Sequence, residues 1–223
     1  MIIKKTVEPL EILAAAIREY KTNENEKTKN ALLLRQFYEK FPIDKIKDLT
    51  LEDYCTGTGN NDSFCYWIEH NLSPLGSYAP AQRGSLVYGI YYSKEKESYR
   101  KNGNIKNVSD EEAIKEITRL IHNAVNSSDE DAIKEVLNQK YFDNGFLLKI
   151  LSTYKPNDYI PIHSHGHIKN CLNLFEINFE KKDSIFYNNK KLIEFYNEKF
   201  QDINLDFYDF MIILYDNFNI ADG

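Results

Sequence analysis

The sequence lacks the features that mark membrane, secreted and disulfide-rich proteins. Nowhere in its 223 residues do about 18 apolar residues run together, so we expect no transmembrane helix. Residues 1–5 contain neither an apolar segment nor a small-residue cleavage site, so we expect no secretory signal. Only three cysteines are present, and this odd number is typical of a reduced intracellular protein rather than a disulfide scaffold. We therefore expect a cytoplasmic protein.

Common catalytic motifs are also missing. The glycine-containing segment Thr56–Gly59 is not followed by the Gly-Lys-Ser/Thr that a phosphate-binding loop requires, so it is better interpreted as a turn. The sequence contains no Gly-x-Ser-x-Gly elbow, and no cysteine lies in a recognisable catalytic context. We therefore predict that the chain is not itself an enzyme and that it uses no cofactor.

A cluster of histidines provides the one candidate metal site. His163, His165 and His167 alternate along an extended segment, and His167 and Cys171 would share one face of a helix that begins near residue 166. Zinc takes four nitrogen or sulfur ligands, so His163, His167 and Cys171 could supply three of them. Polar residues at the start of a helix explain the segment equally well. We predict no metal, and a metal-dependent hydrolase stays as an alternative.

Composition and charge bound the remaining classes. Hydrophobic residues make up 42% of the chain and aromatic residues 13%, which excludes intrinsic disorder. The net charge of −6 argues against a non-specific nucleic-acid coat protein, because such a protein needs a positive field. A negative net charge is still compatible with a basic patch on one face of the protein. One stretch holds five cations and only two acids, Glu95 and Glu97; its cations are Lys94, Lys96, Arg100, Lys101 and Lys106.

The apolar spacing predicts an α+β fold that is dominated by helices. Residues 1–40 and 176–223 read as terminal helices, and Ser109 with Glu112 forms a capping box that begins a helix. Residues 56–92 contain five of the nine glycines and the best strand of the protein, Leu86–Tyr92. We predict a single domain, 1–223, with a small mixed or antiparallel sheet formed mainly from residues 56–92. Residues 93–108 are expected to form a loop.

Several short blocks resemble a known family. Residues 63–69 read Ser-Phe-Cys-Tyr-Trp-Ile-Glu, and Leu-Gly-Ser and Tyr-Gly-Ile-Tyr follow at 75–77 and 88–91. This order resembles the N-terminal domain of McrB-type AAA+ modification-dependent restriction proteins of bacteria. Further matching blocks extend the resemblance over most of residues 41–175; they are 41–46, 49–54, 149–156 and 159–162. The segment 78–85 departs from the glycine-rich turn of the family, and Tyr88 replaces a phenylalanine.

The resemblance implies a DNA-binding specificity domain of a type IV, McrBC-like restriction system that serves antiviral defence. Such a domain recognises a modified base in double-stranded DNA, which is often methylated. An AAA+ GTPase domain and a nuclease subunit do the remaining work, so any GTPase or nuclease activity would lie outside this chain. The departure at 78–85 implies that the preferred target here differs from that of relatives.

Residues for such a role can be named. Aromatic rings stack on an extruded base while cations hold phosphates. We predict a base-recognition pocket of Tyr66, Trp67, Tyr78 and Tyr88. The predicted phosphate-binding residues are Arg83, Lys94, Lys96, Arg100 and Lys101. Ordinary packing of an aromatic-rich fold is the competing interpretation of these rings. The competing function is a protein-interaction or oligomerisation domain of a bacterial defence protein, in which the aromatic strand forms the interface.

Overall fold

Helices make up 66% of the computed structural model, which describes residues 8–78, 84–127, 130–180, 184–200, 202–203 and 205–221. The helices are α1 (Pro9–Glu19), α2 (Glu24–Lys40), α3 (Leu51–Tyr54), α4 (Phe64–Tyr66), α5 (Ser85–Tyr88), α6 (Asp110–Asn126), α7 (Glu130–Gln139), α8 (Asn144–Tyr154), α9 (His165–Leu174), α10 (Ile185–Phe200) and α11 (Phe207–Asn217). Two strands, β1 (Ile90–Ser93) and β2 (Ser98–Lys101), form the sheet. Short 3₁₀ or π helices complete the described elements; they are η1 (Ile43–Asp48), η2 (Trp67–Asn71), η3 (Ser73–Leu75) and η4 (Gly103–Asn107). The prediction of a helix-dominated α+β fold is confirmed.

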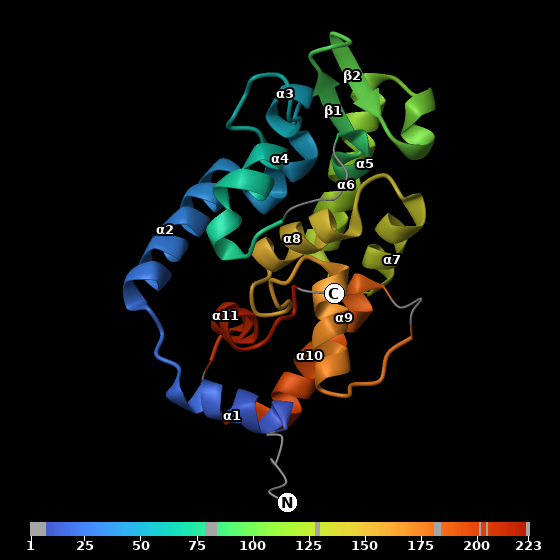
Figure 1. The fold of residues 1–223 in the computed structure, drawn as a ribbon. Coiled ribbons are helices and arrows are strands. Elements are labelled where there is room, and N and C mark those ends of the chain that lie inside the picture. The colour runs from blue at the N-terminus through green and yellow to red at the C-terminus, as the bar shows by residue number, and fades with distance from the viewer. Residues whose placement is uncertain are drawn as a thin grey trace, which may run out of the picture.

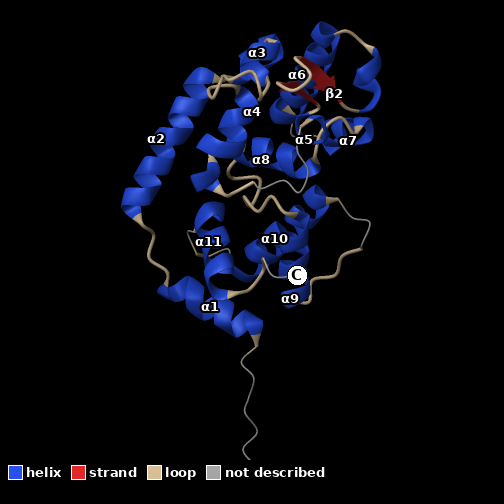
Figure 2. Cartoon of the chain, turned by 45° about the horizontal axis from the view of Figure 1, so that its top comes forward, coloured by secondary structure: helices blue, strands red, loops and turns tan. Residues whose placement is uncertain are grey.

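The helices are arranged between two ends of the molecule. The β hairpin and α3 lie at one end, α1 lies at the other beside α11, and α2 runs along one side between them (Figure 1). Figure 2 shows the same arrangement from a second direction, with the hairpin close to α6. The contact between α1 and α11 is anchored by buried Asp209, which accepts hydrogen bonds from the Tyr20 hydroxyl at 2.9 Å and the Thr22 hydroxyl at 2.8 Å.

Local signals place the helices as the sequence predicts. Ser109 accepts a hydrogen bond from the Glu112 amide at 3.1 Å, and the Glu112 carboxylate accepts one from the Ser109 amide at 3.0 Å. This reciprocal pair begins α6, so the predicted capping box is confirmed. α2 begins earlier than its apolar residues suggest, because the Asn23 side chain accepts from the Glu26 amide and caps a polar first turn.

The position of the sheet corrects the prediction. The two strands pair antiparallel within residues 90–101, so the sheet lies mostly beyond the predicted segment 56–92. Residues 85–88 form the helical turn α5, because Gly84 and Gly89 adopt positive φ angles of 74° and 81° on either side of it. The predicted loop 93–108 contains β2. Its four residues, Ser-Tyr-Arg-Lys, lack the apolar alternation that would have indicated a strand.

Aromatic rings fill the part of the core that joins α2 to the upper end of the molecule. The ring of Phe37 lies 5.3 Å from those of Phe41 and Tyr154, and about 6 Å from those of Phe64 and Trp67. These residues come from α2, α4, α8 and the turn that follows α4. The core therefore unites segments that are more than a hundred positions apart in the sequence. Within the described residues, no helix is both long enough and apolar enough to cross a bilayer.

Candidate nucleic-acid interface

The predicted phosphate-binding residues of the basic stretch lie on one β hairpin. Lys94 and Lys96 occupy the turn after β1, and Arg100 and Lys101 belong to β2. The fifth predicted residue, Arg83, lies outside the described residues. The hairpin stands at one end of the molecule (Figure 1). Four of the five predicted cations are therefore brought together, although no sequence pattern indicated the strand that carries two of them.

Two of these cations are already engaged. The Lys101 ammonium lies 2.7 Å from the Asp110 carboxylate and donates to the Val108 carbonyl, and its side chain is only 14% exposed. Lys96 forms an exposed ion pair with Glu95 at 3.0 Å. Exposed pairs of this kind contribute little, so Lys96 can exchange partners readily. Lys101 instead fastens the hairpin to the start of α6.

Lys94 and Arg100 are the exposed cations of the hairpin that form no ion pair with a described residue. Arg100 lies directly opposite Tyr91 across the two strands, so both side chains are on the same face of the hairpin. Gly84 lies against the ring of Tyr91, because a Cβ atom added to it would fall 2.7 Å from that ring. This face thus combines a ring with a free guanidinium.

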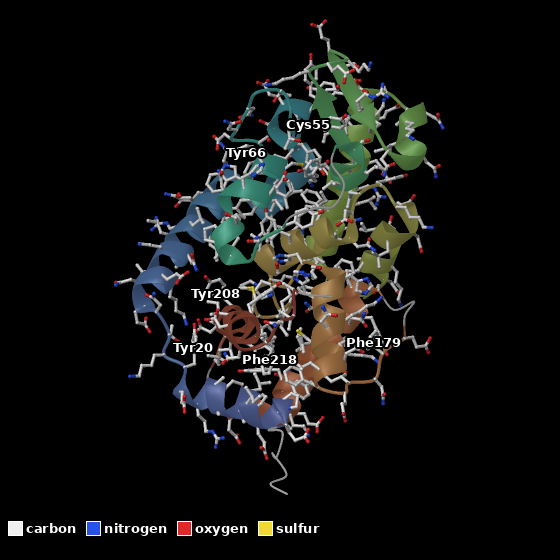
Figure 3. The ribbon with its side chains drawn as sticks, in the orientation of Figure 1. Tyr20, Cys55, Tyr66, Phe179, Tyr208 and Phe218 are labelled. Atoms are coloured by element: carbon white, nitrogen blue, oxygen red, sulfur yellow. The ribbon has the colours of Figure 1, made fainter. Side chains whose placement is uncertain are left out.

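The four aromatic residues of the predicted base pocket pack in two different parts of the molecule. Tyr66 and Trp67 are half-buried. The Trp67 ring packs against Phe37, and its indole nitrogen donates to the Asp62 carboxylate at 2.6 Å. The Tyr66 ring lies 4.5 Å from that of His70. Figure 3 shows Tyr66, the last residue of α4, in the upper half of the molecule. These two residues belong to the packing around α4 and α2.

The other two predicted rings pack on α8. Tyr78 and Tyr88 are 7% and 5% exposed, and their rings lie 6.1 Å and 5.2 Å from that of Phe146. The Tyr88 hydroxyl donates to the Glu69 carboxylate, and the Tyr78 hydroxyl donates to Asp143 at 2.9 Å. Burial, followed by the charge of Asp143, raises the pKa of Tyr78. The Tyr78 hydroxyl therefore stays protonated and serves as a donor.

Tyr78 lines a cavity of about 780 Å³ in the described part of the molecule. Its walls come from residues 73–78, the beginnings of α8 and α9, and two residues of α11, Met211 and Tyr215. The volume lies within the range of about 300–1,000 Å³ that ligand pockets usually have. Asp143, which caps α8, connects this wall with the hairpin, because its amide donates to the Val87 carbonyl of α5 at 2.9 Å. α5 leads directly into β1.

The three histidines also line this cavity, but each has its own protein partner. The buried His163 ring lies 2.9 Å from the Ser152 hydroxyl and donates from Nδ1 to the Ser77 carbonyl at 3.2 Å. The His167 ring contacts the Tyr215 hydroxyl at 2.8 Å, and His165 accepts from Asn188 at 2.9 Å.

No group of three metal-ligating side chains converges among the described residues. Burial, followed by the nearby charge of Lys149, lowers the pKa of His163 well below 6.5. The histidines therefore form separate polar contacts in the cavity wall, and the proposed zinc ligands are not assembled.

A buried lysine holds the wall of the cavity in place. Lys149 of α8 is fully buried, and its ammonium donates to the carbonyls of Leu72 at 2.7 Å, Leu75 at 3.2 Å and Gly76 at 2.6 Å. Burial lowers its pKa from 10.5 to about 7. Sequence reasoning missed Lys149 and Asp143. The signal for Lys149 was a lysine within an otherwise apolar helix. The signal for Asp143 was an aspartate just before that helix, where it can act as an N-cap.

The chain matches no protein-family model, and comparison with curated proteins and with solved structures finds no significant relative.

Proposed function

We propose that this chain is a DNA-binding specificity domain that recognises a modified base in duplex DNA, as part of a McrBC-like restriction system in the bacterial cytoplasm. In that system an AAA+ GTPase domain and a nuclease subunit would act on the DNA that this domain selects. The observation that carries the proposal is the outer face of the hairpin, where Arg100 and Tyr91 lie side by side and Lys94 is unpaired among the described residues.

Charge and chemistry support this assignment of the hairpin. A guanidinium recognises phosphate oxygens in a planar, bidentate geometry, and an adjacent ring adds a surface on which a base or sugar packs. A two-stranded ribbon also has dimensions that the major groove of DNA admits. Because the whole chain is acidic, two to three phosphate contacts give modest affinity, and linked copies in an AAA+ ring would raise it by avidity.

The 780 Å³ cavity supports the second half of the proposal, the reading of one base. It is large enough for an extruded nucleotide, and it carries the predicted residue Tyr78 together with polar histidine and serine side chains. Tyr66, Trp67 and Tyr88 would then support this region rather than form its walls. Their rings pack against those of His70, Phe37 and Phe146, respectively.

Fluorescence anisotropy with duplexes that contain cytosine or 5-methylcytosine tests the proposal at two salt concentrations. We expect binding at low salt that weakens as salt is added, because phosphate contacts release counterions. In the double variant Lys94→Glu/Arg100→Glu, affinity should fall at least about tenfold, and the slope of log K against log salt should decrease by about two. Failure to bind any duplex at low salt would contradict the proposal.

A charge-matched control separates a local interface from the overall charge. The double variant Lys21→Glu/Lys29→Glu makes the same charge change with exposed lysines of the segment 20–30, away from the hairpin. We expect it to bind nearly as well as the unmodified protein. If both double variants lose affinity equally, the hairpin is not the binding surface. Light scattering on the same samples tests the alternative, since a stable dimer without DNA binding favours a protein-interaction domain.

A further inference from the structure

The cavity lined by Tyr78 is several times larger than one base requires. Its volume is about 780 Å³, whereas a cavity of roughly 150 Å³ holds benzene, whose ring has the size of a pyrimidine. Pockets of about 300–1,000 Å³ usually hold drug-sized ligands of more than one ring. A methylated base would therefore leave most of this volume unfilled, and there is room for a substituent at least as large as the base.

The wall of this cavity does not favour a negatively charged ligand. None of the described residues that line it is a lysine or an arginine, and Asp143 contributes a carboxylate. Burial lowers the pKa of His163 and of His167, so both imidazoles are neutral at pH 7. Asp143 and Ser164 already cap the amides at the starts of α8 and α9. We therefore expect the phosphates of a DNA strand to stay outside the cavity and the group inside it to be neutral.

Exposed polar side chains of the wall can bind hydroxyl groups. Asp143 Oδ1 accepts from the Tyr78 hydroxyl and from two helix amides, whereas no described residue donates to Oδ2. Asn144 is exposed, and its side chain forms no hydrogen bond with a described residue. Ser73 and Ser77 are exposed and line the same cavity. A carboxylate accepts, and amides and hydroxyls both donate and accept, so this set suits the hydroxyls of a ligand, which also do both.

Tyr215 of α11 adds an aromatic ring to the wall. It is 38% exposed, its hydroxyl lies 2.8 Å from Nδ1 of His167, and the two ring centres are 5.8 Å apart. The C–H groups of a sugar ring carry partial positive charge, so they pack favourably on the negative face of an aromatic ring. The cavity therefore combines an exposed ring with groups that bind hydroxyls, and this combination suits a neutral sugar.

We propose that the modified base recognised in this cavity is a pyrimidine that carries a hexose, whose hydroxyls are bound by Asp143 and Asn144 and whose ring packs on Tyr215. This inference rests on the proposed function, because it names the modification that the DNA-binding domain selects. A base and its hexose together fill the cavity better than a methylated base does, and neither group is charged.

Fluorescence anisotropy with four duplexes of one sequence tests this inference. At one position they carry cytosine, 5-methylcytosine, 5-hydroxymethylcytosine or β-glucosyl-5-hydroxymethylcytosine. We expect the glucosylated duplex to bind at least about tenfold more tightly than the other three, because it alone supplies the sugar hydroxyls. Equal affinity for all four, or a preference for another of them, overturns the inference but leaves the hairpin as a DNA-binding surface. No binding of any duplex at low salt overturns the proposed function and this inference with it.

Variants of the wall give a second readout, the ratio of the affinities for the glucosylated and the plain duplex. Tyr215→Ala removes the ring on which the sugar packs and should lower this ratio at least about fivefold. Tyr187→Ala makes the same substitution at an exposed tyrosine of α10 that does not line the cavity, and it should leave the ratio unchanged.

A third variant keeps the test decisive if Tyr215→Ala does not fold. Asn144→Ala removes an exposed side chain that has no partner among the described residues, so we expect it to fold and to lower the ratio as well. An unchanged ratio in every folded variant of Tyr215 and Asn144 refutes the sugar site. An equal fall of the ratio in Tyr187→Ala refutes it too.

Discussion

The buried Lys149 should make the stability of this protein depend on pH in an unusual way. Its pKa is lowered from 10.5 to about 7 by burial, so the folded protein releases this proton above pH 7 while the unfolded chain keeps it up to about pH 10.5. Stability rises with pH wherever the unfolded state binds more protons. Lys149 therefore destabilises the fold below pH 7, and this penalty is relieved as the pH rises from 7 towards 10.5.

The size of the effect follows from this window. Between pH 6 and pH 9 the folded and unfolded states differ by one proton over about two pH units. At about 1.4 kcal/mol per unit, the free energy of unfolding gains about 2 to 3 kcal/mol from this residue. The variant Lys149→Met retains the length of the side chain but cannot titrate. All other groups contribute equally to both proteins to a first approximation.

Urea denaturation of the two proteins at pH 6, 7, 8 and 9 measures the difference. We expect the unmodified protein to gain about 2 to 3 kcal/mol relative to Lys149→Met across this range. The carbonyls of Leu72, Leu75 and Gly76 offer a competing effect, because they stabilise the charged ammonium. If the two pH profiles are parallel within about 0.5 kcal/mol, these carbonyls keep Lys149 charged throughout, and the reasoning from burial is refuted.

Two further substitutions test the packing of the hairpin and the start of α6. Gly57→Ala should destabilise the protein by at least about 2 kcal/mol, because its φ is +92° and the new Cβ would lie 2.0 Å from the Tyr92 carbonyl. Gly59→Ala is the control, since its φ is similar but nothing lies within 4 Å; equal losses in thermal denaturation would contradict the predicted clash. Ser109→Ala should cost about 1 kcal/mol in urea denaturation by removing the cap of α6, whereas Ser109→Asp, which can still cap, should not.

The helices were predictable because their signals are local. The Ser109–Glu112 capping box is a contact between residues three positions apart, so the sequence displays it directly. The apolar spacing of α1 and α11 likewise predicts helices, although not that the two pack together. That contact depends on Asp209 meeting Tyr20 and Thr22, which are more than 180 positions away. Pairings of this separation leave no trace in a local pattern.

The predicted strand Leu86–Tyr92 is wrong over residues 86–88, because their composition favours a strand whereas the backbone there forms a helical turn. Leu86, Val87 and Tyr88 are good strand residues, but Gly89 turns the chain at a φ of 81°, and the residues before it form a helical turn. A Cβ atom at Gly89 would fall 2.8 Å from the Ile117 side chain of α6. A tertiary contact therefore decides the conformation here.

In the candidate site, the grouping of the cations was easier to predict from the sequence than the surroundings of the aromatic rings. Lys94 and Arg100 lie on one hairpin because they are only six positions apart in the sequence, although residues 93–108 were expected to form a loop. Rings are different, because each can bury its apolar surface against whichever neighbour the fold supplies. Trp67 meets Phe37 of α2, whereas Tyr78 and Tyr88 meet Phe146 of α8. Aromatic content alone cannot distinguish a pocket wall from such packing.

The connection between hairpin and cavity gives the two parts of the proposed site a common mechanical basis. Asp143 accepts hydrogen bonds from Tyr78 and from the first amides of α8, while its own amide donates to Val87 next to β1. A displacement of the hairpin by a bound phosphate backbone would therefore act on the residue that caps α8 and orients the cavity wall. Lys149 of α8 also contacts this wall, through the carbonyls of Leu72, Leu75 and Gly76. The cavity wall is therefore hydrogen-bonded to α8 at two positions, Asp143 and Lys149. Binding at the hairpin and binding in the cavity should consequently be coupled rather than independent.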